Sequence, residues 1–235
     1  MSEASLIAAM DAWSAATDAD AVYPLKFTPT ELADAAAQKI LTRREHTDGV
    51  DRVVGLTWTP ASRDALWIAI QDDRHFHLVS GLIDEELPTS TRTDKLLYQR
   101  LDLPWPFADR QWVIEVKNND ALAAATGGGL WERSWALTSL RGATQESADA
   151  VWVSVNDGGW LLADVDGGTL LGYHVRSVVD GNIPNELVTQ WCQSTMRGLL
   201  QGIVDRTAEV PTHYDASHPP MLRPDGTPIP PFADL

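Results

Sequence analysis

The stretch from Asp180 to Val210, DGNIPNELVTQWCQSTMRGLLQGIVDRTAEV, decides the fold of this 235-residue chain. Its apolar residues recur every three or four positions, which is the period of one helix face. Pro184 suits the first helical turn, and Pro211 prevents the helix from continuing far beyond Val210. The stretch therefore predicts one helix of about 25 residues and about 37 Å, long enough to cross a small domain.

Gly198 and Gly202 lie one turn apart on this helix. Each glycine destabilises a helix by up to about 1 kcal/mol relative to alanine, so a compensating close approach is expected there. Two interpretations stay open. Either the backbone of a sheet packs tightly against the helix, or a ligand lies between helix and sheet.

The composition limits the function. The net charge is −15, with 33 acidic against 18 basic residues, which argues against nucleic acid and against steady docking on anionic lipid. No apolar run reaches about 18 residues, and the N-terminus carries acidic residues where a signal peptide needs basic ones. A soluble, cytoplasmic protein is expected. The single cysteine, Cys192, lies on the apolar helix face and is interpreted as a buried structural thiol rather than a nucleophile.

Three segments are expected: an N-terminal extension (residues 1–20), one domain (21–210) and a proline-rich tail (211–235). Whether the tail wraps the domain is left open. Within the domain, Thr28, Pro29 and Glu31 form a capping box that predicts a helix through ELADAAAQKILTRRE, which ends at residue 45. A strand is predicted from Val50 to Trp58, followed by a helix through ASRDALWIAIQDD that Thr59 and Pro60 open.

From residue 78 to residue 178, short alternating runs are separated by turn residues. Seven such runs in succession are typical of an antiparallel meander. The predicted fold class is therefore α+β, with the last helix covering one face of the sheet.

Three motifs in the right order resemble the START (StAR-related lipid transfer) family: LTWTPASRDALWIAIQDD (residues 56–73), LDLPWPFADRQWVIEV (101–116) and GWLLADVDGGTLLGYHVRSVVDGNIPNELVTQW (159–191). The resemblance covers roughly residues 45 to 208. It implies a helix-grip fold, in which a curved antiparallel sheet wraps a long C-terminal helix and encloses an elongated apolar cavity. Members of the family bind or carry lipids, and relatives in the wider superfamily include polyketide cyclases.

The sequence departs from the family pattern at three positions. The signature Arg-Asp is Arg110-Gln111 here. Sterol-binding members are similar in placing an arginine and an acid in the cavity, and the corresponding positions are Val116 and, nearby, Leu97. This apolar pair argues against a sterol-hydroxyl site of that kind.

Strand parity selects the side chains expected to face the ligand, because alternate residues of a strand share one face. Large aromatic residues can line such a pocket, and this interpretation is favoured over the alternative of plain core filling. With the helix positions added, the predicted ligand-binding residues are Arg110, Trp112, Ile114, Val116, Trp131, Trp135, Tyr173, Trp191, Thr195 and Leu199.

Arg110 has two interpretations: a charge that anchors a ligand, or one half of a structural ion pair with Asp102, Asp109 or Glu85. The structural pair is favoured, because an unpaired buried charge is strongly destabilising.

Two motifs suggest metals. His75 and His77 could form half of a metal site, but no third ligand is placed with them. Asp164 and Asp166 beside two glycines look like calcium ligands, but a hairpin turn explains them better.

The leading hypothesis is a protein that binds a lipid or other hydrophobic ligand in an internal cavity and transfers it, with transient membrane contact and without a cofactor or metal. The alternative is a polyketide cyclase-like enzyme on the same scaffold, for which Tyr173, His174, Arg176 and Arg110 are the nominated residues. No sequence signal favours catalysis. A third possibility is an interaction domain whose cavity is filled by its ten tryptophans.

Overall fold

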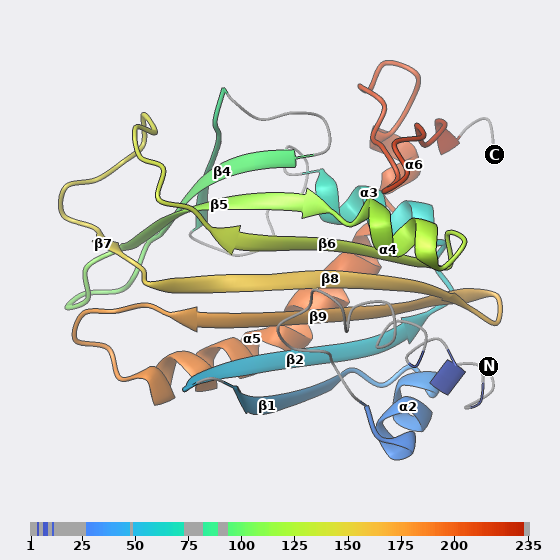
Figure 1. The fold of residues 1–235 in the computed structure, drawn as a ribbon, viewed down its shortest axis with the longest axis horizontal. Coiled ribbons are helices and arrows are strands. Elements are labelled where there is room, and N and C mark those ends of the chain that lie inside the picture. Colours follow the sequence, from blue (N-terminus) through green and yellow to red (C-terminus); the bar gives the residue numbers. More distant parts are fainter. Residues whose placement is uncertain are drawn as a thin grey trace.

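A computed structural model describes residues 27–47, 49–72, 82–88 and 94–232, together with positions 4, 7, 8 and 11 (Figure 1). Strands dominate the middle of the chain, and a long helix follows them, as predicted. The elements are α2 (Pro29–Ala36), β1 (Leu41–Thr47), β2 (Val50–Thr59), α3 (Arg63–Gln71), β3 (Leu82–Glu86), β4 (Asp94–Leu101), β5 (Arg110–Asn118), α4 (Asp120–Ala125), β6 (Leu130–Leu137), β7 (Val151–Trp152), β8 (Val155–Val165), β9 (Gly168–Val178), α5 (Asn185–Arg206) and α6 (Val210–His213).

The described strands form one curved sheet in the order β1-β2-β9-β8-β6-β5-β4-β3, and the short β7 pairs with β5. All neighbours are antiparallel except β5 and β7. Helix α5 crosses behind the sheet from the lower left to the upper right of Figure 1. Side chains alternate accordingly: Val53 belongs to the core on the α5 side, whereas Val54 and Leu56 pack with Leu32 of α2 on the opposite side. The α+β helix-grip architecture is confirmed.

The predicted helix through residue 45 is wrong in its second half. The capping box is present, because the Thr28 hydroxyl accepts from the Glu31 amide while the Glu31 carboxylate accepts from the Thr28 amide. Helix α2 nevertheless ends at Ala36, and Gln38 adopts a left-handed backbone conformation with φ of 59°. Strand β1 then begins at Leu41, and its charged residues hid the alternation that marks a strand.

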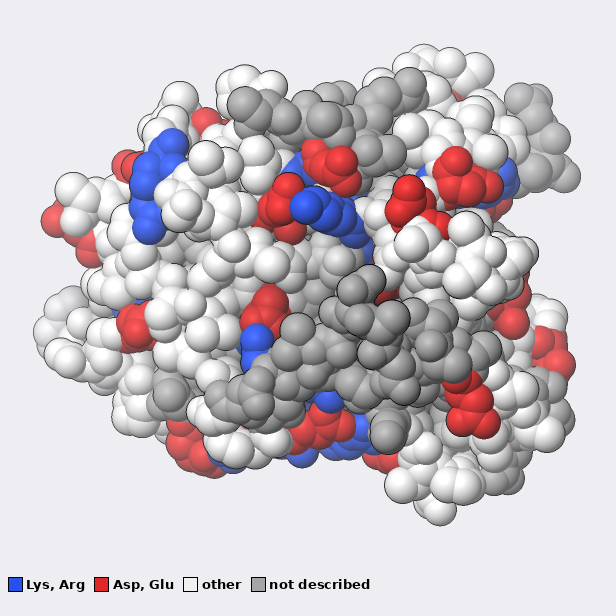
Figure 2. Space-filling model, in the orientation of Figure 1, with Lys and Arg blue, Asp and Glu red and all other residues white. Residues whose placement is uncertain are grey.

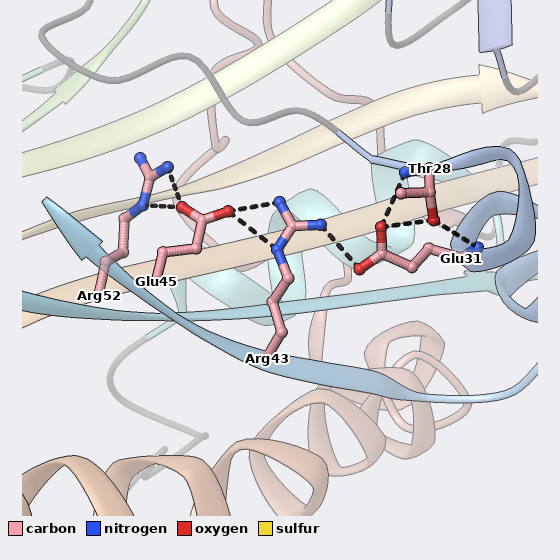
Figure 3. Close-up of polar contacts among 5 residues, drawn as sticks. All are labelled: Thr28, Glu31, Arg43, Glu45 and Arg52. Carbon is pink, nitrogen blue, oxygen red and sulfur yellow. Dashed lines mark hydrogen bonds and ion pairs between the residues drawn. The ribbon is translucent and has the colours of Figure 1, made fainter.

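A chain of charge-assisted hydrogen bonds fixes β1 between α2 and β2 (Figure 3). Arg43 donates to Glu31 and to Glu45, each at 2.8 Å, and Arg52 of β2 donates to the other oxygen of Glu45 at 2.9 Å. Edge strands are often protected by charged side chains, and here the charges also join three elements.

Two local predictions concern the N-cap of a helix and a hairpin turn. Helix α3 is capped by Ser62, whose hydroxyl accepts from the Ala65 amide, and not by Thr59, because β2 extends through Thr59. The Asp166-Gly167 pair forms the predicted two-residue hairpin turn between β8 and β9, with φ of 47° and 80°.

The interpretation of tight sheet packing at Gly198 and Gly202 is wrong, whereas Gly198 lines the cavity described below. A Cβ atom added at either position would meet nothing within 4 Å. The close approach occurs instead at Gly55 of β2, where a Cβ atom would lie 2.6 Å from Leu200 Cδ1 and 2.9 Å from Met196 Cγ. The sheet, not the helix, supplies the glycine that lets α5 pack tightly.

The proline-rich segment after α6 packs onto the domain. Tyr214 and Ile229 are buried, and the Tyr214 hydroxyl donates to the Ile229 carbonyl at 2.8 Å. Arg223 pairs with Asp64 of α3 at 2.7 Å, and Trp67 donates to the Leu222 carbonyl at 2.9 Å. The segment therefore covers α3.

Candidate functional site

A cavity of about 830 Å³ lies between the sheet and α5. Helix α5 has its main contacts with β1, β2, β9 and α3, so the space over β4, β5 and β6 stays open. The apolar lining of the cavity comes mainly from the strands, and Ile70 of α3 closes one end of the cavity. The apolar lining residues contributed by strands are Leu82, Leu97, Leu101, Trp112, Ile114, Val116, Trp135, Trp160, Tyr173 and Val175.

Three aromatic rings form a fixed wall on β6, β8 and β9. The ring centroids of Trp160 and Tyr173 are 4.3 Å apart, and those of Trp135 and Tyr173 are 5.6 Å apart. Trp135 is held by a 3.0 Å hydrogen bond from its Nε1 to the Asn156 side chain. The Trp135 ring also packs directly against Gly158. Any other residue at this position would overlap the ring, since a Cβ atom at Gly158 would lie 2.4 Å from Trp135 Cζ2. The wall is therefore preorganised.

The facing wall on β4 and β5 is apolar. Leu97 and Val116 are buried and line the cavity, so the positions that carry charges in similar sterol-binding proteins are hydrocarbon here. Trp112 donates its Nε1 proton to Gln99 Oε1 at 2.7 Å, which satisfies the indole and leaves its ring to face the cavity. Apart from Gln99 and Arg110, the side chains that these two strands contribute to the cavity are apolar.

Exposed apolar side chains border the opening of the cavity. Phe107 in the β4–β5 loop is 39% exposed, and Leu187 and Trp191 on α5 are 52% and 45% exposed, although all three line the cavity. Trp105, two residues before Phe107, is 92% exposed. These four side chains form an exposed apolar rim at the opening of the cavity.

Comparison with known proteins identifies the architecture. No protein-family model matches the sequence, and no curated protein matches it. Human STARD10 superposes with a TM-score of 0.62 at 12% identity, covering 74% of this chain and 71% of that one. A STAR-related lipid transfer protein fragment from Xanthomonas axonopodis gives 0.60 at 20% identity (72% and 93% covered), and human StAR-related lipid transfer protein 5 gives 0.58 at 11% (72% and 82%).

The chain has the START-domain fold. This confirms the fold expected from the sequence resemblance, although identities of this size establish the fold alone.

In this START fold the signature arginine has a different role from the one predicted. Arg110 is 2% exposed and donates Nε to the Val179 carbonyl at 2.6 Å, Nη2 to the Asp180 carbonyl at 2.9 Å, and Nη1 to the Ala108 carbonyl. Burial lowers the pKa of Arg110, and the nearby carboxylates of Asp180 and Asp109 oppose that shift.

The ion pairs predicted for Arg110 are not formed. Asp102 and Asp109 lie 3.6 Å and 3.7 Å from Arg100 Nε, and Glu85 accepts hydrogen bonds from Thr144 and Gln145. The guanidinium is held by backbone carbonyls, so Arg110 fixes the turn between β9 and α5 while also bordering the cavity.

Trp131 also departs from prediction. It shares a sheet face with Trp135, but it lies toward the end of the sheet that α3 fills, and it packs edge-on against Trp67 with centroids 5.4 Å apart. Arg63 stacks on its other side at 3.9 Å from the ring centroid. Correct parity therefore did not place Trp131 in the cavity. The other nine predicted ligand-binding residues line the cavity: Arg110, Trp112, Ile114, Val116, Trp135, Tyr173, Trp191, Thr195 and Leu199.

Several cavity residues were missed. Gln99, Asn156 and Trp160 belong to strands, and their parity could have selected them. Phe107 lies in a loop and Ile70 comes from α3, so no strand or helix period marks them as neighbours of the ligand space.

The nominated catalytic residues do not converge. His174 and Arg176 alternate with the cavity-facing Tyr173 and lie on the other face of β9, where Arg176 pairs with Asp157 at 2.9 Å. Burial raises the pKa of the Cys192 thiol to about 11, so it stays protonated at neutral pH. His75 and His77 lie outside the described residues.

Proposed function

We propose that this protein binds a lipid or similar hydrophobic molecule in the cavity beneath α5 and transfers it between membranes. The observation that supports this proposal most strongly is the 830 Å³ cavity with two largely apolar walls. Moving a hydrocarbon chain from water into such a space is favourable by about 25 cal/mol per Å² of buried apolar surface. Two of the structural neighbours are named as lipid transfer proteins, which supports the same use of the fold.

The rim at Trp105, Phe107, Leu187 and Trp191 supplies the proposed transient membrane contact. Tryptophan and phenylalanine side chains partition into the interfacial region of a bilayer. Among the described residues, no helix is long and apolar enough to cross a membrane. In this proposal the N-terminal half of α5 and the β4–β5 loop act together as a gate when the rim meets lipid.

Zwitterionic acyl lipids are the proposed cargo. Leu97 and Val116 offer no charge to a sterol hydroxyl. The rings of Trp135 and Tyr173 can bind a choline group through cation–π contacts, each of which stabilises the complex by about 0.5–2 kcal/mol. The net charge of −15 disfavours anionic head groups, within a screening length of about 8 Å. On the face shown in Figure 2, acidic and basic residues lie interspersed without a continuous basic area.

A vesicle-to-vesicle transfer assay tests the proposal. Fluorescent phosphatidylcholine should move faster than fluorescent phosphatidylserine, and faster than a fluorescent cholesterol analogue. A Trp105→Ala variant should slow transfer but keep equilibrium binding, because Trp105 is 92% exposed and does not line the cavity. Transfer of the sterol faster than phosphatidylcholine would overturn the cargo assignment, and no transfer of any lipid would overturn the transfer function.

A further inference from the structure

The hydrogen bonds of the cavity's polar side chains leave two hydroxyl groups unused. Gln99 accepts from Trp112, Asn156 accepts from Trp135, and Arg133 donates to Asn118 at 2.7 Å. On α5, the hydroxyls of Ser194 and Thr195 donate to the Trp191 carbonyl at 2.8 Å and 3.0 Å. Arg110 is bound to three carbonyls.

Tyr173 and Ser177 remain. Both lie on the cavity-facing side of β9, and the hydroxyl of neither makes a hydrogen bond with any residue in the described part of the chain. Tyr173 is partly buried and lines the cavity, so its hydroxyl is free to donate a hydrogen bond to a molecule bound there. Burial raises the pKa of Tyr173 above its ordinary value, with Cys192 as the smaller cause, so the hydroxyl keeps its proton.

The two hydroxyls differ in how firmly they are placed. The Tyr173 ring is fixed between Trp160 and Trp135, at 4.3 Å and 5.6 Å between centroids, whereas no such stacking holds the short side chain of Ser177. On the neighbouring strand, Gly55 lies opposite Tyr173 and brings Met196 and Leu200 of α5 close to the sheet. Tyr173 is therefore a rigid, neutral donor beneath the helix, surrounded by hydrocarbon.

We infer that the Tyr173 hydroxyl donates a hydrogen bond to a carbonyl oxygen of the bound ligand, and that the ligand class is an acyl or keto compound with that carbonyl flanked by hydrocarbon. This inference rests on the proposed function, since it assigns a specificity contact inside the same cavity. A neutral donor in an apolar site discriminates against a ligand that lacks the acceptor, because that ligand leaves the hydroxyl unpaired.

A matched pair of fluorescent probes, decanoylpyrene and decylpyrene, tests the inference. They differ only in a carbonyl in place of a methylene group, and binding is followed by energy transfer from tryptophan to pyrene. The wild-type protein should bind decanoylpyrene roughly 5- to 10-fold more tightly than decylpyrene. Tyr173→Phe should remove this preference by weakening only the keto probe, and Ser177→Ala should retain it.

Each other outcome contradicts a distinct statement. Equal binding of the two probes by the wild type, or an equal loss of both in Tyr173→Phe, would overturn the hydroxyl contact and leave the proposed function standing. Binding of neither probe would overturn hydrophobic-ligand binding itself. Tyr173→Phe should unfold at the wild-type temperature, because it removes no internal hydrogen bond, and a markedly lower temperature would show that the hydroxyl has a structural partner.

Discussion

Arg110 connects a strand of the cavity wall with the turn that leads into α5. Its guanidinium replaces the water that the carbonyls of Ala108, Val179 and Asp180 would otherwise bind. The adjoining turn is conformationally demanding, since Asp180 and Gly181 have φ of 53° and 70°. A side chain that satisfies three carbonyls at once holds this turn in place.

Arg110→Met should lower the free energy of unfolding by about 2–4 kcal/mol, because it leaves buried carbonyls without a donor. Arg100→Met is the matched control and should lower it by less than about 1 kcal/mol, since its carboxylate partners are 3.6 Å and 3.7 Å away and only the Gln145 carbonyl, at 3.2 Å, loses a donor. Chemical denaturation measures both. Full stability of Arg110→Met combined with loss of lipid binding would show that Arg110 anchors the ligand instead.

His174 gives the fold a predictable response to acid. Burial and, to a smaller extent, the neighbouring Arg52 and Arg176 together lower the pKa of His174 to about 3. The unfolded chain takes up a proton near pH 6.5, whereas the folded chain does so only near the lowered pKa. The stability contributed by a neutral His174 is therefore present above about pH 6.5 and is lost as the pH falls towards 3.

His174→Gln should unfold with a shallower dependence on pH than the wild type between about pH 6 and pH 4. The difference in slope approaches at most about 1.4 kcal/mol per pH unit, the value for one proton. Thermal or chemical unfolding at several pH values measures it, and carboxylates that titrate in this range cancel in the comparison. Parallel curves for the two proteins would contradict a buried neutral histidine.

At the scale of elements, the glycine that allows close packing of α5 on the sheet belongs to β2 and not, as expected from the sequence, to α5. The helix period predicted α5 well, because its apolar face meets one continuous surface. Tight packing of the sheet against the glycines of α5 is the interpretation that fails, since a glycine shows only that a side chain is absent. Whether the neighbouring space holds backbone, ligand or solvent depends on contacts with β2 that are distant in sequence.

Gly198→Ala and Gly202→Ala should each raise the free energy of unfolding by about 0.5–1 kcal/mol, because alanine favours the helix and its Cβ meets no atom. Gly55→Ala should lower it by about 1–3 kcal/mol, because its Cβ would overlap Leu200 and Met196. Chemical denaturation of the three single variants measures these changes. A stabilised Gly55→Ala would mean that α5 does not approach β2 as closely as described.

Strand parity was reliable for faces and unreliable for positions along a strand. The predicted cavity side is correct for Trp112 and Trp135. Trp131 shares that face of the sheet, but Trp67 of α3 packs against it and separates it from the cavity. The missed strand β1 shows the opposite failure. Its consecutive charged residues at 43–45 look like the continuation of the helix in sequence, and only the partners of Arg43 and Glu45, which are Glu31 and Arg52 on separate elements, reveal a strand.

At the scale of the whole molecule, the sheet holds α5 closely along β2 and leaves it apart from β4, β5 and β6, and the cavity is the space that results. The C-terminal segment adds to the closed end by covering α3 through Leu222 and Arg223. Apolar residues are exposed at the other end, around Phe107 and Trp191. One end is therefore closed by packed side chains, and the other is the end at which we propose that the ligand enters.

Native mass spectrometry after incubation with phosphatidylcholine vesicles tests most directly whether this cavity binds lipid. The wild type should carry one phosphatidylcholine molecule per chain. A Val116→Phe, Leu199→Trp double variant, which adds bulk from opposite walls, should carry much less, whereas Gln201→Trp on the outer side of α5 should match the wild type. Absence of bound lipid from the wild type, or equal loading of a folded double variant, would contradict binding beneath α5.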